Sequence, residues 1–146
     1  MRNGTYSMNP ITPDLALWVG EEPPAGSTIG QHFDVLVLAA VEIQDHTKYP
    51  GVSRIMKVPL DDNGSPPTKD EVYLAYLGGI DVAKHLLQHR MVLSTCYMGK
   101  NRSSLVAGLA LRNLNWEADK VIKAIRKARG SDALCNTWFE EIIRTY

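Results

Sequence analysis

Short apolar segments alternate with polar, turn-rich segments along the first hundred residues of the chain. Residues 33–40 form a nearly continuous apolar run of strand length, which is typical of a strand buried on both faces of a sheet. Three further segments have the length and composition of short strands: 15–20, 53–59 and 90–95. The pattern therefore predicts a central sheet.

The other periodic segments have helical spacing. Thr68 followed by Glu71 is the arrangement of a capping box and predicts the start of a long helix, which Gly78 and Gly79 weaken. Asp132 is the expected N-cap of the last helix. Helices are predicted for residues 68–89, 102–114, 117–129 and 133–145.

This order of elements predicts the fold class. Strands interleaved with helices, followed by helices alone, favour a single α/β domain with a mostly parallel central sheet and helices packed on both of its faces. Residues 1–13 are polar and are expected to form an N-terminal arm, so that 14–146 make up the folded domain. Ligand sites of such sheets lie at the carboxyl ends of the strands.

Charge and composition exclude several classes of function. The 16 basic and 16 acidic residues give a net charge of zero, so nonspecific binding to nucleic acid is not expected. No apolar run approaches the ~20 residues of a membrane span, and the N-terminus does not resemble a signal peptide, so the expected location is the cytoplasm. The two cysteines lack the spacing of a metal site. His85 and His89 are four residues apart, as in some metal sites on helices, but they lack the glutamate of a zinc-binding HExxH motif, so neither metal nor cofactor is expected.

The segment between the strand at 90–95 and the helix at 102–114 carries the candidate chemistry. It places Cys96 before Gly99 and Arg102, with Ser103 next. A loop curled over a helix N-terminus turns backbone N–H groups inward and adds the positive end of the helix dipole, which together bind anions such as phosphate. The same field lowers a thiol pKa from about 8.5 and favours a nucleophilic thiolate.

Residues 95–103, Thr-Cys-Tyr-Met-Gly-Lys-Asn-Arg-Ser, resemble the signature of the cysteine-dependent protein tyrosine and dual-specificity phosphatases. The resemblance extends from about Ile11 to Ile143. It implies that Cys96 attacks phosphorus, that Arg102 and the loop amides hold the phosphoryl oxygens, and that Ser103 helps the thiolate leave. The residues expected to bind the substrate phosphate are Tyr97, Met98, Gly99, Lys100, Asn101 and Arg102.

The resemblance also implies a general acid on an upstream loop after a strand. Asp62 occupies that position in Leu60-Asp-Asp-Asn63, and Asp61 is the alternative. Both could instead be turn formers, since aspartate favours such loops. Likewise, a buried core cysteine is the alternative for Cys96, and a core thiol is the expectation for Cys135.

The signature departs from the family at Thr95, which stands where a histidine is usual. A threonine hydroxyl brings no positive charge, so we expect a less depressed Cys96 pKa and slower chemistry. Lys100 resembles a lysine of some phosphoinositide phosphatases, and Asn101 an asparagine of RNA 5′-triphosphatases.

The sequence therefore predicts a metal-independent phosphatase that hydrolyses phosphate monoesters through a phosphocysteine, with a phosphorylated protein as the expected substrate. Three alternatives stay open. The chain could be a pseudophosphatase that binds phosphate or another oxyanion without turnover. It could be a phosphoinositide or RNA 5′-phosphate phosphatase of the same fold. It could also be a sulfur-transfer enzyme of the rhodanese type, which would not need Asp62.

Overall fold

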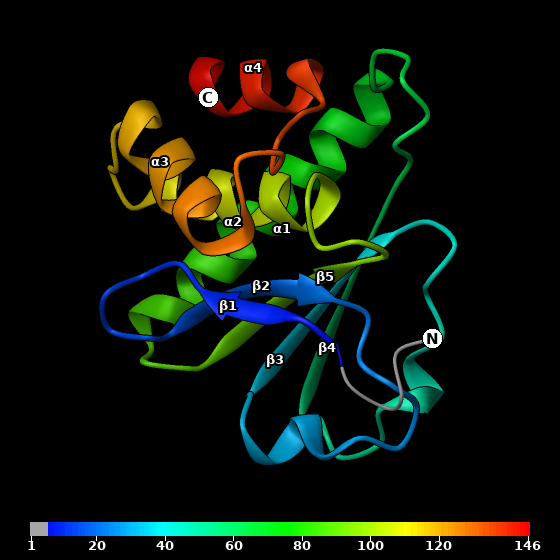
Figure 1. Cartoon of the computed structure of the whole chain (residues 1–146). Coiled ribbons are helices and arrows are strands. Elements are labelled where there is room, and N and C mark those ends of the chain that lie inside the picture. Colours follow the sequence, from blue (N-terminus) through cyan, green and yellow to red (C-terminus); the bar gives the residue numbers. More distant parts are fainter. Residues whose placement is uncertain (1–5) are drawn as a thin grey trace.

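The computed structural model describes residues 6–146, which form a five-stranded sheet with strand order β1-β2-β5-β3-β4 (Figure 1). All neighbouring strands are parallel except the antiparallel pair β1 and β2. The strands are β1 (Met8–Pro10), β2 (Leu17–Glu21), β3 (Val35–Ala40), β4 (Arg54–Leu60) and β5 (Val92–Cys96). The predicted α/β class with a mostly parallel sheet is confirmed.

Four α-helices accompany the sheet: α1 (Lys69–Leu87), α2 (Arg102–Asn113), α3 (Ala118–Arg129) and α4 (Thr137–Thr145). The capping box at the start of α1 is confirmed, because Thr68 Oγ1 accepts from the Glu71 amide and Glu71 Oε1 accepts from the Thr68 amide, both at 3.1 Å. No helix in the described part of the chain combines the length and apolar character that a bilayer span requires.

The helices lie on one face of the sheet, and the prediction that they cover both faces is wrong (Figure 1). Alternate strand residues such as Val37 and Val58 pack under α1 to α4. The opposite face, with Leu36 and Leu93, packs against Phe33, Tyr49 and the short 3-10 turn η1 (Thr28–Gln31). The reason is topological: only the β4–β5 connection contains an α-helix, and the connections that lead into β3 and β4 contain the short 3-10 turns η1 and η2 (His46–Lys48).

The two glycines inside α1 allow close packing. A Cβ on Gly79 would lie 2.7 Å from Leu109 Cβ of α2, and a Cβ on Gly78 would lie 3.0 Å from Val58 Cγ2 of β4. Any larger residue at Gly79 would push the two helices apart. The glycines thus lower helix propensity but let α1 approach both α2 and the sheet.

Two boundaries differ from the expectations. Residues 8–10, inside the segment expected to be an arm, form β1, while residues 1–5 lie outside the described part of the chain. The last helix begins at Thr137 rather than near residue 133, and its N-cap is Asn136, whose Oδ1 accepts from the amides of Trp138 and Phe139. The prediction of Asp132 as the N-cap is therefore wrong.

Candidate active site

The segment of residues 96–102, which we call the Cys96 loop, lies at the carboxyl edge of the sheet. Strand β5 ends at Cys96, and α2 begins six residues later at Arg102. Cys96 is only 3% exposed and packs against Ala40 and Ile43, which lie at and just beyond the end of the neighbouring strand β3. Its Sγ lies 3.2 Å from Ser103 Oγ in the first turn of α2. The thiol is thus buried at the N-terminus of a helix.

The backbone of the loop has its carbonyl groups turned outward. Because every peptide bond in the described chain is trans, each N–H points away from the carbonyl that precedes it, so the amides of residues 99–101 point away from Arg129 and Leu134. Such a row of N–H groups forms an anion-binding nest. The outward carbonyls are those of Met98 and Gly99, which accept from Arg129 at 3.1 and 2.9 Å, and that of Lys100, which accepts from the Leu134 amide at 3.0 Å. The Asn101 carbonyl accepts from the Leu105 amide at 2.8 Å and so begins the hydrogen bonding of α2.

Gly99 is required for this backbone path. Its φ is +66°, in the left-handed region, and a Cβ there would lie 2.5 Å from the carbonyl carbon of Gly20 and 2.7 Å from Arg129 Nη2. The loop therefore lies directly against β2 and Arg129, and no larger residue fits at this position.

Arg129 supports the loop from its outer side. Its side chain donates to the carbonyls of Met98 and Gly99 and also to Ser7 Oγ and Asn9 Oδ1 near β1. Burial lowers the pKa of Arg129 from its ordinary value. The sequence analysis missed this residue, because an arginine near the end of an amphipathic helix carries no local sign that it is buried.

Arg102 is held by Glu42, a second residue that the sequence analysis missed. Nη1 and Nη2 of Arg102 donate to the two carboxylate oxygens of Glu42 at 2.6 and 2.8 Å, and Nη1 also donates to Leu60 O at 3.1 Å. A guanidinium has five N–H donors, and among residues 6–146 the Nε–H and the second Nη2–H of Arg102 make no hydrogen bond to the protein. Glu42 was detectable in principle, since it follows the buried strand β3 at the carboxyl edge where ligand sites lie.

The Arg102–Glu42 pair is charged over the ordinary range of pH. Hydrogen bonding from Arg102 holds the pKa of Glu42 below its ordinary value of 4.5. Burial of Arg102 opposes its charge, but the hydrogen bonds to Glu42 and the negative charges of Cys96, Glu42 and Asp62 outweigh this effect, so the pKa of Arg102 is raised. The guanidinium is therefore fixed in place as a cation.

Asp62, rather than Asp61, is tied to the loop. The Asp62 carboxylate accepts from Asn101 Nδ2 at 2.9 Å and from Asn136 Nδ2 at 2.7 Å, and Asn101 Oδ1 accepts from the Asn136 amide at 3.1 Å. The backbone N–H of Asp61 instead donates a hydrogen bond to Glu71 Oε2 at 2.8 Å, and the Asp61 carboxylate accepts one from the side-chain amide of Asn63. Asn136 therefore joins the start of α4, the Cys96 loop and the Asp62 loop.

The remaining predicted residues have different surroundings. Thr95 is buried, and its hydroxyl donates its proton to Val37 O of β3 at 2.7 Å, away from Cys96. Lys100 Nζ donates to Asp132 Oδ1 at 2.9 Å and to the carbonyl of Arg129. Cys135 is exposed beside Asn101, so the expectation of a core thiol is wrong.

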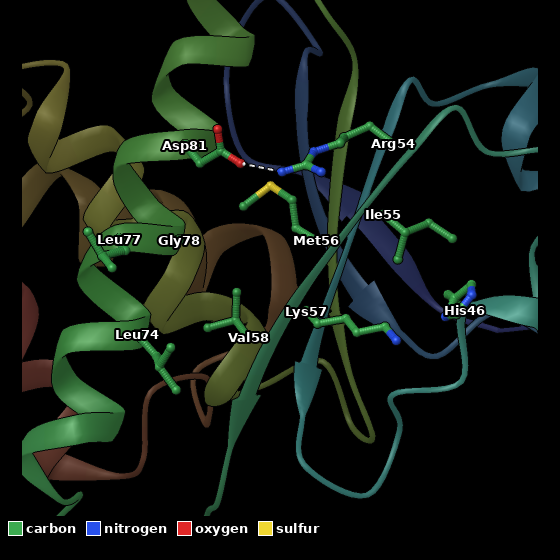
Figure 2. Close-up of a pocket in the computed structure, with 10 residues that line it drawn as sticks. All are labelled: His46, Arg54, Ile55, Met56, Lys57, Val58, Leu74, Leu77, Gly78 and Asp81. Atoms are coloured by element: carbon green, nitrogen blue, oxygen red, sulfur yellow. Dashed lines mark hydrogen bonds and ion pairs between the residues drawn. The ribbon is translucent and has the colours of Figure 1, made fainter.

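The site is distinct from the groove between α1 and the edge strand β4. This groove has a volume of about 600 Å³, and its lining includes Met56, Val58, Leu74 and Leu77 but no residue of the Cys96 loop (Figure 2). Within residues 6–146, no three His, Cys, Asp or Glu side chains are grouped so that they could hold a metal ion.

Comparisons with solved structures identify the fold. A mouse protein described as a dual specificity phosphatase and crystallised with zinc tungstate matches with a TM-score of 0.78 at 20% identity, covering 100% of this chain and 89% of that one. Human DUSP28 matches with a TM-score of 0.77 at 20% identity, covering 95% and 91% of the two chains. PTPMT1 matches with a TM-score of 0.72 at 16% identity, covering 95% and 92%.

No protein-family model and no curated protein sequence matches this chain. The likeness is therefore one of structure, and it extends over nearly the whole chain. The chain has the dual-specificity phosphatase fold.

Proposed function

We propose that the protein is a phosphatase that hydrolyses phosphate monoesters through a phosphocysteine on Cys96. The observation that carries this proposal is the position of the Cys96 thiol at the N-terminus of α2, beside the Ser103 hydroxyl and six residues before Arg102, whose guanidinium Glu42 holds in place. Thiolate nucleophile, oxyanion donors and a guanidinium are together the groups that phosphoryl transfer requires.

The reaction has two steps. The Cys96 thiolate attacks phosphorus, the bond from phosphorus to the ester oxygen breaks, and Asp62 gives its proton to the departing oxygen. A water molecule then attacks the phosphocysteine, Asp62 takes a proton from it, and the sulfur leaves as thiolate with a hydrogen bond from Ser103. The hydrogen bonds from Asn101 and Asn136 support Asp62 in this role, because they fix its carboxylate next to the loop.

A pseudophosphatase that binds phosphate without turnover is the second candidate. The observation in its favour is that the Thr95 hydroxyl donates its proton to Val37 O. Thr95 therefore cannot stabilise the Cys96 thiolate as the usual histidine would. A human tyrosine phosphatase-like serine/threonine/tyrosine-interacting protein also shares the fold, with a TM-score of 0.73 at 14% identity.

The test of the proposed function is hydrolysis of a small aryl phosphate between pH 5 and 8 without added metal. We expect turnover that vanadate inhibits and that Cys96→Ser abolishes. Absence of turnover in the folded wild type, with vanadate still bound, would favour the pseudophosphatase and make Thr95→His the next variant to build.

Glu42→Gln is expected to lower kcat/KM roughly 10- to 100-fold, because charge-assisted hydrogen bonds that aim the Arg102 fork are lost. Glu42 stays ionised from pH 5 to 8, since its folded-state pKa lies below 4.5, so the loss should be constant across this range and the support from the ion pair should disappear only at lower pH. Steady-state kinetics measures the effect. Glu141→Gln on the exposed side of α4 is the matched control, and equal rates in the two variants would contradict the role of Glu42.

Asn136→Ser tests the positioning of Asp62. Serine keeps an N-cap oxygen for α4 but removes the donor to Asp62 Oδ1. We expect roughly a 10-fold loss with phenyl phosphate and a much smaller loss with nitrophenyl phosphate, whose leaving group needs less protonation. Asn136→Ala, which also loses the cap, controls for stability. A uniform loss with both substrates would mean that Asn136 acts only through folding.

A further inference from the structure

A second groove lies between α3 and the segment that leads from β1 toward β2 (Figure 1). It has a volume of about 690 Å³, and we call it the α3 groove. One wall is formed by residues 9–13 and Leu15, the other by α3, and Trp116 also lines it. The lining includes no residue of the Cys96 loop, so the α3 groove is separate from the candidate active site.

The α3 wall is basic. Lys120, Lys123 and Lys127 line the groove and are exposed. They are three and four residues apart in the helix, so they project from one side of it and span about 10 Å along its axis. Lys120 Nζ lies 4.6 Å from the centre of the Trp116 ring, which holds this ammonium group against an apolar side chain of the groove.

The charges of these lysines are not neutralised within the part of the chain that the structure describes. None of the three ammonium groups forms an ion pair with a carboxylate of residues 6–146. The neighbouring Asp119 carboxylate is bound by Arg144 Nη1 at 2.6 Å, and this contact, followed by the charge of Lys123, lowers its pKa. The groove therefore carries a local positive charge on a chain whose net charge is zero.

The opposite wall is apolar and is held by hydrogen bonds. Its apolar lining residues are Pro10, Ile11, Pro13 and Leu15. Asp14 Oδ1 accepts from Thr12 Oγ1 at 2.7 Å and from the Ala16 amide at 3.1 Å, and the Leu15 amide donates to Thr12 O at 3.0 Å. A wall fixed in this way before a ligand arrives lowers the entropy cost of binding.

Leu15 has a conformation that the isolated chain does not explain. Its φ is +60°, in the left-handed region, which favours Gly or Asn and disfavours a bulky side chain. Its side chain is nevertheless 53% exposed, so burial offsets little of this strain. The backbone is fixed there, because Trp18 Nε1 donates to Leu15 O at 2.8 Å. A strained and exposed leucine beside a groove is explained by contact with another molecule.

The two walls fit an extended acidic peptide. Side chains of an extended chain point alternately to opposite sides, and residues i and i+2 are about 6.6 to 6.8 Å apart. Lys123 and Lys127 are about 6 Å apart along the axis of α3. Acidic side chains at every second position would therefore meet the lysines, and the apolar side chains between them would face Leu15. A flat anionic membrane would reach the lysines but would not enter the groove.

We propose that the α3 groove binds an extended segment of a partner protein in which acidic residues alternate with apolar ones. The acidic side chains pair with the three lysines of α3, and Leu15 contacts an apolar side chain of the partner. This interaction surface goes beyond the proposed phosphatase activity and does not depend on it, since the Cys96 loop takes no part.

The first test measures binding of a labelled peptide in which glutamates alternate with leucines, by fluorescence anisotropy with the wild-type chain. One control peptide has glutamine in place of glutamate, and another has the same composition with its glutamates contiguous. We expect the alternating peptide to bind at least about 10-fold more tightly than either control, and high salt to weaken its binding. Equal binding of either control, or no detectable binding of the alternating peptide, overturns the inference.

Reversing the charge of the lysines tests the basic wall. The double variant Lys123→Glu/Lys127→Glu is expected to bind the alternating peptide at least about 10-fold more weakly, because both new carboxylates repel the glutamates. Lys57→Glu is the matched control, since Lys57 is an exposed residue of β4, at the opposite edge of the sheet from β1. It should bind as the wild type does. Unchanged binding in the double variant would contradict the role of α3.

Leu15→Asn separates binding from folding. Asparagine tolerates a positive φ better than leucine, so the melting temperature should be unchanged or raised. Binding of the alternating peptide should weaken roughly 5-fold, because an apolar contact is lost. A lower melting temperature with unchanged binding would mean that Leu15 serves only the fold, and would overturn its role in the groove.

Vesicles that contain phosphatidylserine test the membrane as a different occupant. We expect the wild type to sediment with them no more than the lysine double variant does. Sedimentation that needs the two lysines, without a preference for the alternating peptide, would overturn the inference in favour of a membrane surface. Turnover of aryl phosphates is measured without the peptide, so failure of this inference is distinguishable from failure of the proposed function.

Discussion

The Cys96→Ser variant is expected to hydrolyse aryl phosphates at least about 10⁴-fold more slowly than the wild type, the order of loss seen when an enzyme's nucleophile is removed. A serine hydroxyl at neutral pH stays protonated and is a much weaker nucleophile than a thiolate. The loop backbone is held by Arg129 and the helix α2, independently of the sulfur, so the variant should still bind phosphate and vanadate. Initial rates and calorimetric oxyanion binding measure the two properties.

Cys135→Ser is the matched control for this prediction. Cys135 is exposed and near the same loop, but its contact is with Asn101 rather than with Ser103. We expect its rate to stay within about threefold of the wild type, because surface substitutions of this kind have small effects. A Cys96→Ser protein that keeps turnover, or a Cys135→Ser protein that loses it, would contradict the assignment of the nucleophile.

Asp62→Asn is expected to lower kcat about 10²- to 10⁴-fold with phenyl phosphate, the usual contribution of a general acid. The loss should be smaller with nitrophenyl phosphate, whose leaving group departs without a proton. Steady-state kinetics with each substrate measures both effects.

Asp61→Asn is the control for Asp62. The Asp61 carboxylate accepts from Asn63, and its amide is bound to Glu71, so its replacement should change the rate less than Asp62→Asn does. A larger loss of rate in Asp61→Asn than in Asp62→Asn would instead assign the general acid to Asp61. Full activity in Asp62→Asn would instead favour the sulfur-transfer alternative, which has no need for this carboxylate.

The Cys96 loop, our candidate for the catalytic loop, was recognisable in the sequence because its residues are close together along the chain. Cys96, Gly99, Arg102 and Ser103 lie within eight positions, and the strand before them and helix after them have clear patterns. The structure adds the cause of the spacing: Gly99 is needed where the loop touches Gly20 and Arg129.

The residues that orient the site were not predictable in the same way. Glu42 lies 60 residues from Arg102, Asn136 lies 74 from Asp62, and Arg129 lies 30 from Gly99. These contacts depend on the strand order and on where α3 and α4 pack, which hydrophobic periodicity does not determine. Asp132 illustrates the difference, since it has the sequence context of an N-cap but binds Lys100 instead.

The sequence pattern was also insufficient to predict which faces of the sheet the helices cover. Strand and helix segments were recognisable, but their placement depends on which connections contain helices. Helices α2 to α4 follow the last strand and pack with α1 on a single face, and the other face is covered by Phe33, Tyr49 and short turns. The alternation of polar and apolar residues along the chain does not distinguish a sheet with helices on both faces from a sheet with helices on one face and short turns on the other.

Capture of the covalent intermediate tests the central claim most directly. Wild-type protein is mixed with an aryl phosphate, quenched in acid within the first turnovers and digested for mass spectrometry. The account predicts one phosphoryl group on the peptide that contains Cys96, absent from Cys96→Ser and accumulating in Asp62→Asn when the leaving group is nitrophenolate. Steady turnover in the wild type without any phosphocysteine, or a phosphoryl group on another residue, would contradict it.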